Sequence, residues 1–135
     1  MNKLNLPVEE FTTPDPITAI ESTPIEELIR LMKVHEVRHL PILRGQKVVG
    51  IVSDRDVRVA SGLNSSERKL IEAQHIMAVD PVSVNFRDSL DEVAFAMSKN
   101  KIGSVVVNDD NEKLIGIFTA TDALNALIEI ARMNN

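Results

Sequence analysis

Two copies of one short pattern contain the residues best suited to binding chemistry. Segments 50–56 and 116–122 both read Gly, apolar, any residue, Ser or Thr, two further residues, then Asp. The glycine permits close approach of the backbone to a ligand. The Ser53 or Thr119 hydroxyl, together with a helix N-terminus, can hold a phosphate. Asp56 or Asp122, one turn further on, can accept both hydroxyls of a ribose. The same spacing also resembles an ordinary capping box, so a single copy leaves both interpretations open.

Basic residues distinguish the two copies. Guanidinium groups suit bidentate contact with phosphate, although exposed arginines often only solvate a helix face. The second half has no basic residue at the matching positions, so we expect a phosphate to be bound mainly by the first half. The first-half residues are Arg38, His39, Arg55 and Arg58. Their matches in the second half are, in the same order, Gly103, Ser104, Thr121 and Leu124.

The pattern belongs to a longer internal repeat. The second half reproduces the first at an offset of 65, which becomes 66 after one inserted residue near Asn111. Asp15-Pro16-Ile17-Thr18 matches Asp80-Pro81-Val82-Ser83, and Met32 matches Met97. Such self-similarity indicates two copies of one supersecondary unit.

Each copy predicts the order strand, helix, strand, strand, helix. The first strands are residues 17–20 and 82–84, and the paired strands are 39–43 with 47–52 and 103–107 with 113–118. Thr23 and Asp88 are expected to cap the helices that follow the first strands. The last helix is expected to turn Leu124, Leu127, Ile128 and Ala131 inward.

The repeats predict an α/β fold. A three-stranded sheet with one exposed apolar face cannot bury that face alone, so we expect the repeats to pack sheet to sheet with pseudo-twofold symmetry and two related clefts. The predicted organisation is repeat one at residues 8–62, a linker helix at 63–74 and repeat two at 75–132.

Composition excludes several classes of protein. The absence of cysteine excludes disulfides, thiolate metal sites and thiol catalysis, and a net charge of −5 argues against nucleic acid as a partner. No apolar run predicts a membrane span or a signal peptide, which favours a cytoplasmic location. His35 and His39 are separated by the predicted helix end, so no metal site is expected, and no nucleophile or acid–base pair predicts an enzyme.

The repeated order and the two Gly-to-Asp motifs resemble the cystathionine-β-synthase (CBS) domain pair, also called the Bateman module. The segment Val37–Ile42 and the segment Ile102–Val107 resemble the middle strand of that family, and the resemblance extends from Val8 to Ile130. It implies a regulatory module that binds AMP, ADP, ATP, S-adenosylmethionine or a related adenosine compound. The chain is similar to small stand-alone bacterial members of the family.

The resemblance also implies roles for individual residues. Arg38 and His39 match in type the basic residues that contact phosphates in the gamma subunits of AMP-activated kinase. Thr18 and Ser83 stand where relatives contact adenine or ribose, and Leu40-Pro41 would supply an apolar wall and backbone groups for the purine. These positions are equally compatible with ordinary strand-edge residues.

Two interpretations of the function remain open at this point. The first is an adenine-nucleotide sensor, a homodimer that acts in trans on an unidentified protein partner. The alternative is a purely structural dimerisation module with empty clefts. Retention of Asp56, Asp122 and the Arg38-His39 pair favours the first.

Overall fold

The computed structural model describes residues 5–133, and these divide into two compact units. The first-repeat unit is Pro16–Pro81, and the second-repeat unit combines Met1–Asp15 with Val82–Asn135. The segment that precedes each repeat along the chain therefore belongs to the unit of the other repeat. This exchange determines which residues lie beside each Gly-to-Asp motif.

The first-repeat unit has a four-stranded sheet in the order β2-β3-β4-β5. Its strands are β2 (Ala19–Ile20), β3 (His39–Arg44), β4 (Lys47–Ser53) and β5 (Ala78–Val79). β2 is parallel to β3, whereas β3 with β4 and β4 with β5 are antiparallel. The β3–β4 hairpin turns at Gly45, whose φ of 63° lies in the left-handed region that favours glycine.

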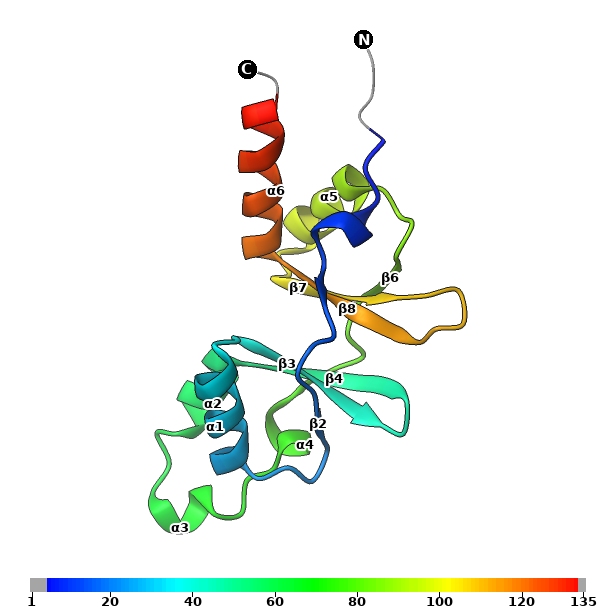
Figure 1. The fold of residues 1–135 in the computed structure, drawn as a ribbon. Helices are drawn as coiled ribbons and strands as arrows, with labels where there is room; N and C mark the ends of the chain where they lie inside the picture. The colour runs from blue at the N-terminus through cyan, green and yellow to red at the C-terminus, as the bar shows by residue number, and fades with distance from the viewer. Residues whose placement is uncertain (1–4, 134–135) are drawn as a thin grey trace. The chain divides into compact units, whose positions relative to one another are not determined.

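The helices of this unit lie on one face of the sheet (Figure 1). They are α1 (Ile25–His35), α2 (Asp54–Ala60), α3 (Ser65–Arg68) and α4 (Ala73–Ile76). Ile25, Leu28 and Met32 come from one face of α1 and pack with Leu40 and Val52 in the core, as the helical spacing predicts. The expected linker helix is instead two short helices, α3 and α4, and Leu70-Ile71 lies in the turn between them.

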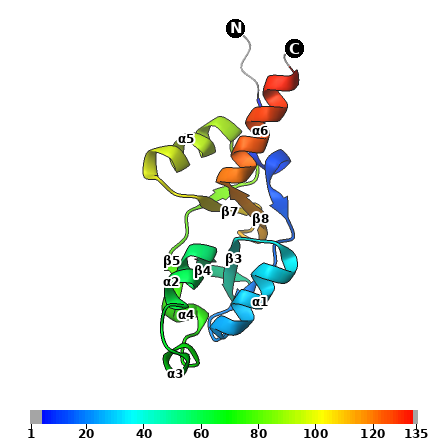
Figure 2. The ribbon, with the colours of Figure 1, turned by 90° about the vertical axis from the view of Figure 1, so that its left-hand side faces the viewer.

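The second-repeat unit has the same arrangement, with strand order β1-β8-β7-β6. Its elements are the 3-10 helix η1 (Val8–Phe11), β1 (Thr13–Pro14), β6 (Ser83–Asn85), α5 (Leu90–Asn100), β7 (Ser104–Asn108), β8 (Leu114–Thr119) and α6 (Ala120–Met133). Helices α5 and α6 lie on one face of this sheet in both Figure 1 and Figure 2. Val93, Met97, Val105 and Phe118 form the core. The α/β class and the tandem repeat are therefore confirmed, although each sheet has a fourth strand that the sequence did not predict.

The helix caps differ from the prediction. Thr23 accepts a hydrogen bond from Ile20 N at 3.0 Å, and Asp88 accepts one from Asn85 N at 2.9 Å. Pro24 and Ser89 stand at the N-cap positions without a side-chain capping bond. Both predicted caps therefore stabilise the turn before the helix, since Ser, Thr and Asp side chains bond readily to nearby backbone groups.

The orientation of α6 also differs from the prediction. Ala126 is buried, and Ala123 and Ile130 pack beside it against the core. Leu124, Leu127 and Ile128 are about half exposed or more, at 60%, 62% and 48%. The sequence predicted that the stripe of Leu124, Leu127 and Ile128 faces the core. The face that contains Ala123 and Ala126 packs there instead, because its small side chains let α6 approach the sheet.

Candidate functional site

The two Gly-to-Asp motifs form the junctions between β4 and α2 and between β8 and α6. In the first-repeat unit the Ser53 hydroxyl accepts from Asp56 N at 3.2 Å, and Asp56 Oδ2 accepts from Ser53 N at 2.9 Å. This is a complete capping box. Helix capping and ligand binding would therefore use the same residues. A ligand could bond to those acceptor sites that the cap leaves unused.

Asp56 retains most of its capacity to accept hydrogen bonds. An ionised carboxylate has about four lone-pair sites. Within the first-repeat unit, Ser53 N donates to Oδ2, and no donor of that unit contacts Oδ1. A vicinal diol could use Oδ1 without displacing the cap.

Asp122 is more fully bonded within the second-repeat unit. Its Oδ2 accepts from Thr119 N at 2.9 Å and from the Thr119 hydroxyl at 3.0 Å, and its Oδ1 accepts from the Thr13 hydroxyl at 3.2 Å. Thr13 lies on β1 and reaches Asp122 because β1 pairs with β8. At the same register in the first-repeat unit, Ala78 on β5 has no hydroxyl. The two aspartates are thus held differently.

The sequence interpretation did not include Thr13. The repeat alignment contained the signal, because Thr13 matches Ala78 at the same offset of 65 that relates Asp15 to Asp80. What the sequence could not show is that the segment before each repeat pairs with the hairpin of the other one.

The motif glycines face protein rather than a ligand. A Cβ on Gly116 would overlap the Thr13 carbonyl oxygen, and a Cβ on Gly50 would lie 2.5 Å from Met77 Sδ and 3.0 Å from the Ala78 carbonyl oxygen. These glycines let β1 and β5 pair closely with their neighbouring strands. The sequence analysis expected these glycines to let a ligand approach the backbone. Where a Cβ atom would stand, neighbouring protein atoms fill the space instead, so the expectation is wrong on that side.

Strand register places other predicted site residues of the first repeat near Asp56. His39 pairs with Ser53 across β3 and β4. The Arg38 carbonyl accepts from Asp54 N at 2.8 Å, which fixes the start of α2 beside Arg38. Thr18 directly precedes β2, and the parallel register of Ala19 with Ile42 places it level with Pro41. One end of this sheet therefore brings these residues together.

Leu40 does not provide the predicted apolar wall. Its side chain is fully buried in the helix-side core. Because side chains alternate along a strand, Pro41 points to the opposite face of the sheet. Pro41 is also fully buried, so neither side chain is exposed as the predicted wall.

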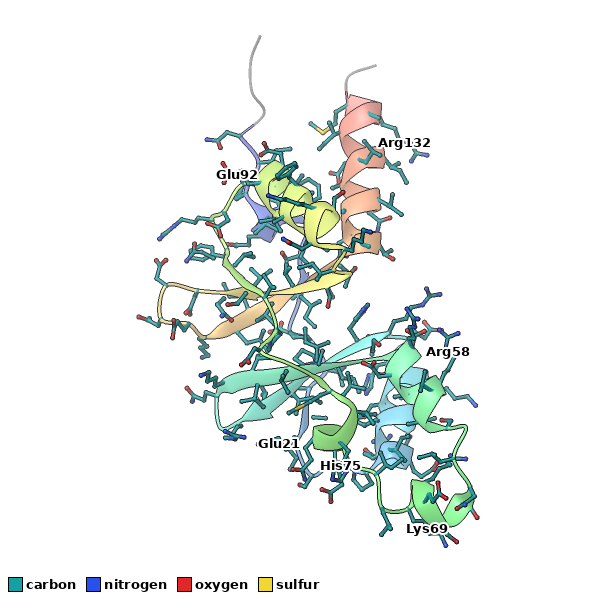
Figure 3. All side chains as sticks on the ribbon, turned by 180° about the vertical axis from the view of Figure 1, so that it is seen from behind. Glu21, Arg58, Lys69, His75, Glu92 and Arg132 are labelled. Carbon is teal, nitrogen blue, oxygen red and sulfur yellow. The ribbon has the colours of Figure 1, made fainter. Side chains whose placement is uncertain are left out.

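The basic residues differ in their surroundings. Arg38, Asp54 and Arg58 line one shallow groove of about 490 Å³ beside α1 and α2. Arg58, labelled on α2 in Figure 3, forms an ion pair with Asp54 at 3.9 Å, and its side chain is 75% exposed. Arg55 and Arg38 are exposed, and no carboxylate of the first-repeat unit lies within ion-pair distance of either. Of Arg38, Arg55 and Arg58, it is Arg58 whose charge is partly compensated by a carboxylate of its own unit.

The corresponding end of the second sheet has no basic side chain at the positions that match Arg38, His39, Arg55 and Arg58. Ser104 pairs with Thr119, and the Gly103 carbonyl accepts from Ala120 N at 3.0 Å, as the Arg38 carbonyl does from Asp54 N. Ser83 begins β6 and is exposed. The backbone geometry is thus repeated, whereas the side chains that would contact a phosphate are not.

A family model for the CBS domain matches the chain twice, at residues 8–62 and 73–129. The chain belongs to the CBS domain family. The two CBS matches account for most of its length. Among residues 5–133, no helix has both the length and the apolarity that crossing a bilayer requires.

Solved CBS pairs share this fold over nearly their whole length. CBSX2 from Arabidopsis thaliana, in complex with AMP, is 26% identical with a TM-score of 0.79, and the match covers 93% of this chain and 98% of that one. The CBS domain pair of protein MJ0100, in complex with 5-methylthioadenosine and S-adenosyl-L-methionine, is 30% identical with a TM-score of 0.81, covering 92% and 97%.

Among curated proteins, inosine-5'-monophosphate dehydrogenase of Korarchaeum cryptofilum is 35% identical over 114 residues, which cover 84% of this chain and 23% of that protein. L-aspartate semialdehyde sulfurtransferase of Methanocaldococcus jannaschii is 34% identical, covering 85% and 22%. The chain thus spans less than a quarter of the length of these two relatives, and the match is confined to that part.

Proposed function

We propose that this CBS pair is a regulatory module that binds an adenosine-type ligand, namely AMP, ADP, ATP or S-adenosylmethionine, and acts in trans on a protein partner without catalysing a reaction. The observation that carries the proposal is that Oδ1 of Asp56 has no donor within the first-repeat unit, beside an intact helix cap. A carboxylate with free acceptor sites at the start of a helix is suited to a ribose diol.

The proposed contacts divide according to chemistry. Asp56 and Asp122 are proposed for ribose hydroxyls, and Ser53 and Thr119 for a phosphate or the adjacent sugar. Thr18, Ser83 and the Leu40-Pro41 backbone are proposed for the purine. The residues proposed to contact a phosphate through their basic side chains are Arg38, His39, Arg55 and Arg58.

Two similarities support an adenosine compound in particular. CBSX2 was solved with AMP, and the MJ0100 pair with S-adenosyl-L-methionine and 5-methylthioadenosine. Both matches cover more than nine-tenths of this chain. We place the function in the cytoplasm, where these metabolites are available.

The alternative is a purely structural dimerisation module. The exposed stripe of Leu124, Leu127 and Ile128 on α6 favours self-association. Self-association is compatible with both candidates, so ligand binding is the property that separates them.

Mass spectrometry of small molecules released from the purified protein tests the proposal. The chain has no Trp or Tyr, so co-purified adenine would dominate its near-ultraviolet absorbance. Release of an adenosine compound supports the sensor. A preparation that contains none, and that gives no calorimetric heat with the four candidates, supports the structural alternative.

A further inference from the structure

The first helix of each repeat begins in the same backbone setting. Ile25 N donates to the Ile71 carbonyl at 3.0 Å, and the matching Leu90 N donates to the Leu6 carbonyl at 2.8 Å. The segment that ends at Ile71 therefore corresponds to the segment that ends at Leu6, at the repeat offset of 65. This correspondence allows the surroundings of α1 and of α5 to be compared residue by residue.

Both carboxylates in the first turn of α1 are paired with arginine. Arg68, on α3, donates through Nη2 to Glu26. Arg30, on α1 itself, donates through Nε to Glu27 Oε2 at 2.8 Å. The Arg68 side chain is only 29% exposed, so α3 holds this arginine against its own unit.

The matching carboxylates of α5, Asp91 and Glu92, lack such partners. Among residues 5–133, no basic side chain lies within ion-pair distance of either one. Phe95 stands at the position that matches Arg30, and it is 68% exposed. The second repeat thus keeps the acidic pair of the first repeat without the arginines that neutralise it.

The chain also takes a different path after the last helix of each repeat. α2 ends at Ala60, and the chain then turns into α3, which carries the arginine. α6 instead continues past the matching Ala126 as far as Met133. Within the described part of the second-repeat unit, no short helix therefore takes the place of α3.

A groove borders the unpaired carboxylates, and Glu92 is labelled beside it in Figure 3. Its volume is about 860 Å³, and among the described residues that line it only Asp91 and Glu92 carry charge. A concave, mostly apolar surface with a few polar groups is typical of a binding site. Its apolar lining comes from the N-terminal segment, α5 and α6, and includes Leu6, Leu90, Ala94, Ala126, Leu127 and Ile130.

We propose that this groove is the docking site for a short segment of the protein partner that carries arginine or lysine beside apolar side chains. The first repeat supplies the precedent within the same chain, since Glu26 at the position of Asp91 binds Arg68 from a short helix. The acidic pair favours a basic segment over an acidic one. Because exposed ion pairs contribute little by themselves, the apolar lining would supply most of the affinity. The inference rests on the proposed function, since that function requires a protein partner.

A peptide of residues 61–71 of this chain is the probe, because it contains Arg68 in the sequence that the first repeat places beside Glu26. Titration into isotope-labelled protein should shift the amide NMR signals of Ala94 and Ile130 saturably, with a dissociation constant on the order of 1 mM. The same peptide with Arg68→Glu should bind about threefold more weakly or worse, because it loses the charge pair.

Two variants of the protein separate docking at the groove from a general effect of charge. Asp91→Lys should weaken binding of the unmodified peptide about tenfold, because a cation then faces the arginine of the peptide. Glu112→Lys makes the same change of charge in the β7–β8 turn, outside the groove lining, and should leave the affinity unchanged. Thermal unfolding of each variant confirms that it is folded before titration.

The outcomes distinguish the possible occupants. The absence of saturable shifts on α5 and α6, or equal affinities in Asp91→Lys and wild type, would overturn the inference. Lys3 matches Arg68 at the repeat offset and lies outside the described residues. A peptide that binds only to Lys3→Ala would show that the chain fills its own groove. Groove signals that move with protein concentration, and not with peptide, would assign the groove to a second copy. Either result would also overturn the inference.

The test is independent of the ligand. Calorimetry with AMP, ADP, ATP and S-adenosylmethionine, without peptide, measures adenosine binding separately. Failure of the peptide to bind would leave adenosine binding in place. A protein that binds the peptide but none of the four compounds would keep the docking site and overturn the proposed ligand.

Discussion

The Thr13 hydroxyl donates to the Asp122 carboxylate at 3.2 Å across the pairing of β1 with β8. Ala78 holds the same register on β5, so Asp56 has no such donor. The two aspartates of the repeated motif therefore contribute differently to their own units. This relationship leads to a prediction about stability that needs no ligand.

Asp122→Asn should destabilise the protein more than Asp56→Asn, by a difference of about 1 kcal/mol. Asp122 accepts from Thr13 and twice from Thr119, whereas Asp56 accepts from Ser53 N within its unit. Urea unfolding measures both variants. Thr13→Val is the control and should account for part of the Asp122→Asn loss. Equal losses in the two asparagine variants would show that the Thr13 bond contributes nothing.

Gly116→Ala should destabilise the protein by about 1–3 kcal/mol, because the new methyl group would overlap the Thr13 backbone. Gly103→Ala is the matched control, since a Cβ at position 103 has no heavy atom within 4 Å. Thermal unfolding compares the two. If Gly116→Ala melts at the wild-type temperature, the close pairing of β1 with β8 is not needed for stability.

Arg38→Ala should weaken AMP binding roughly ten- to a hundredfold, because a hydrogen bond to a charged group contributes about 1.5–3 kcal/mol. Adenosine has no phosphate, so its affinity should not change. Asp56→Ala should weaken AMP and adenosine alike by removing a ribose contact that they share. Calorimetry measures both ligands with each variant. If Asp122→Ala abolishes AMP binding while Arg38→Ala and Asp56→Ala leave it intact, the second repeat provides the main contacts.

Leu127→Glu should convert a homodimer into a monomer. The stripe of Leu124, Leu127 and Ile128 is exposed on α6, and a C₂ dimer buries such a stripe against its own copy. Light scattering at tens of micromolar measures the mass. Glu129→Gln on the same helix is the control, because it alters charge outside the stripe. A monomeric wild-type protein would contradict the prediction.

Arg44→Gln should raise the pKa of Glu21 toward its ordinary value. The Arg44 guanidinium donates two hydrogen bonds of 2.8 Å to the Glu21 carboxylate (Glu21 is labelled in Figure 3), and these bonds hold the pKa of Glu21 below that value. A lowered pKa in the folded state stabilises the protein above the unfolded pKa of about 4.3, and this contribution is lost as pH falls through the folded value.

Carboxyl NMR titration measures the pKa of Glu21 directly. Arg30→Gln provides the control, because Arg30 lowers the pKa of Glu27 in the same way and should leave Glu21 unaffected. An unchanged Glu21 titration in Arg44→Gln would show that the ion pair does not persist in solution.

The repeat made much of the fold predictable. Spacing identified α1 and α5 and both hairpins, because each copy supported the interpretation of the other. The caps were not predictable, since Thr23 and Asp88 have backbone partners on either side and the sequence does not select between them. Periodicity likewise located the stripe on α6 but not the face that packs against the sheet.

The candidate site was predictable in residue type but not in bonding. Ser53 and Asp56 were identified from spacing, and the structure adds that their cap leaves Oδ1 without a donor in its unit. Thr13 was not identified, because its contact with Asp122 depends on the pairing of β1 with β8.

The most direct test of the account is calorimetric titration of ligand-free protein with AMP. The account predicts saturable heat and a measurable affinity that falls in Asp56→Ala. The absence of heat with AMP, ADP, ATP and S-adenosylmethionine, from protein shown by its cooperative unfolding to be folded, would contradict it.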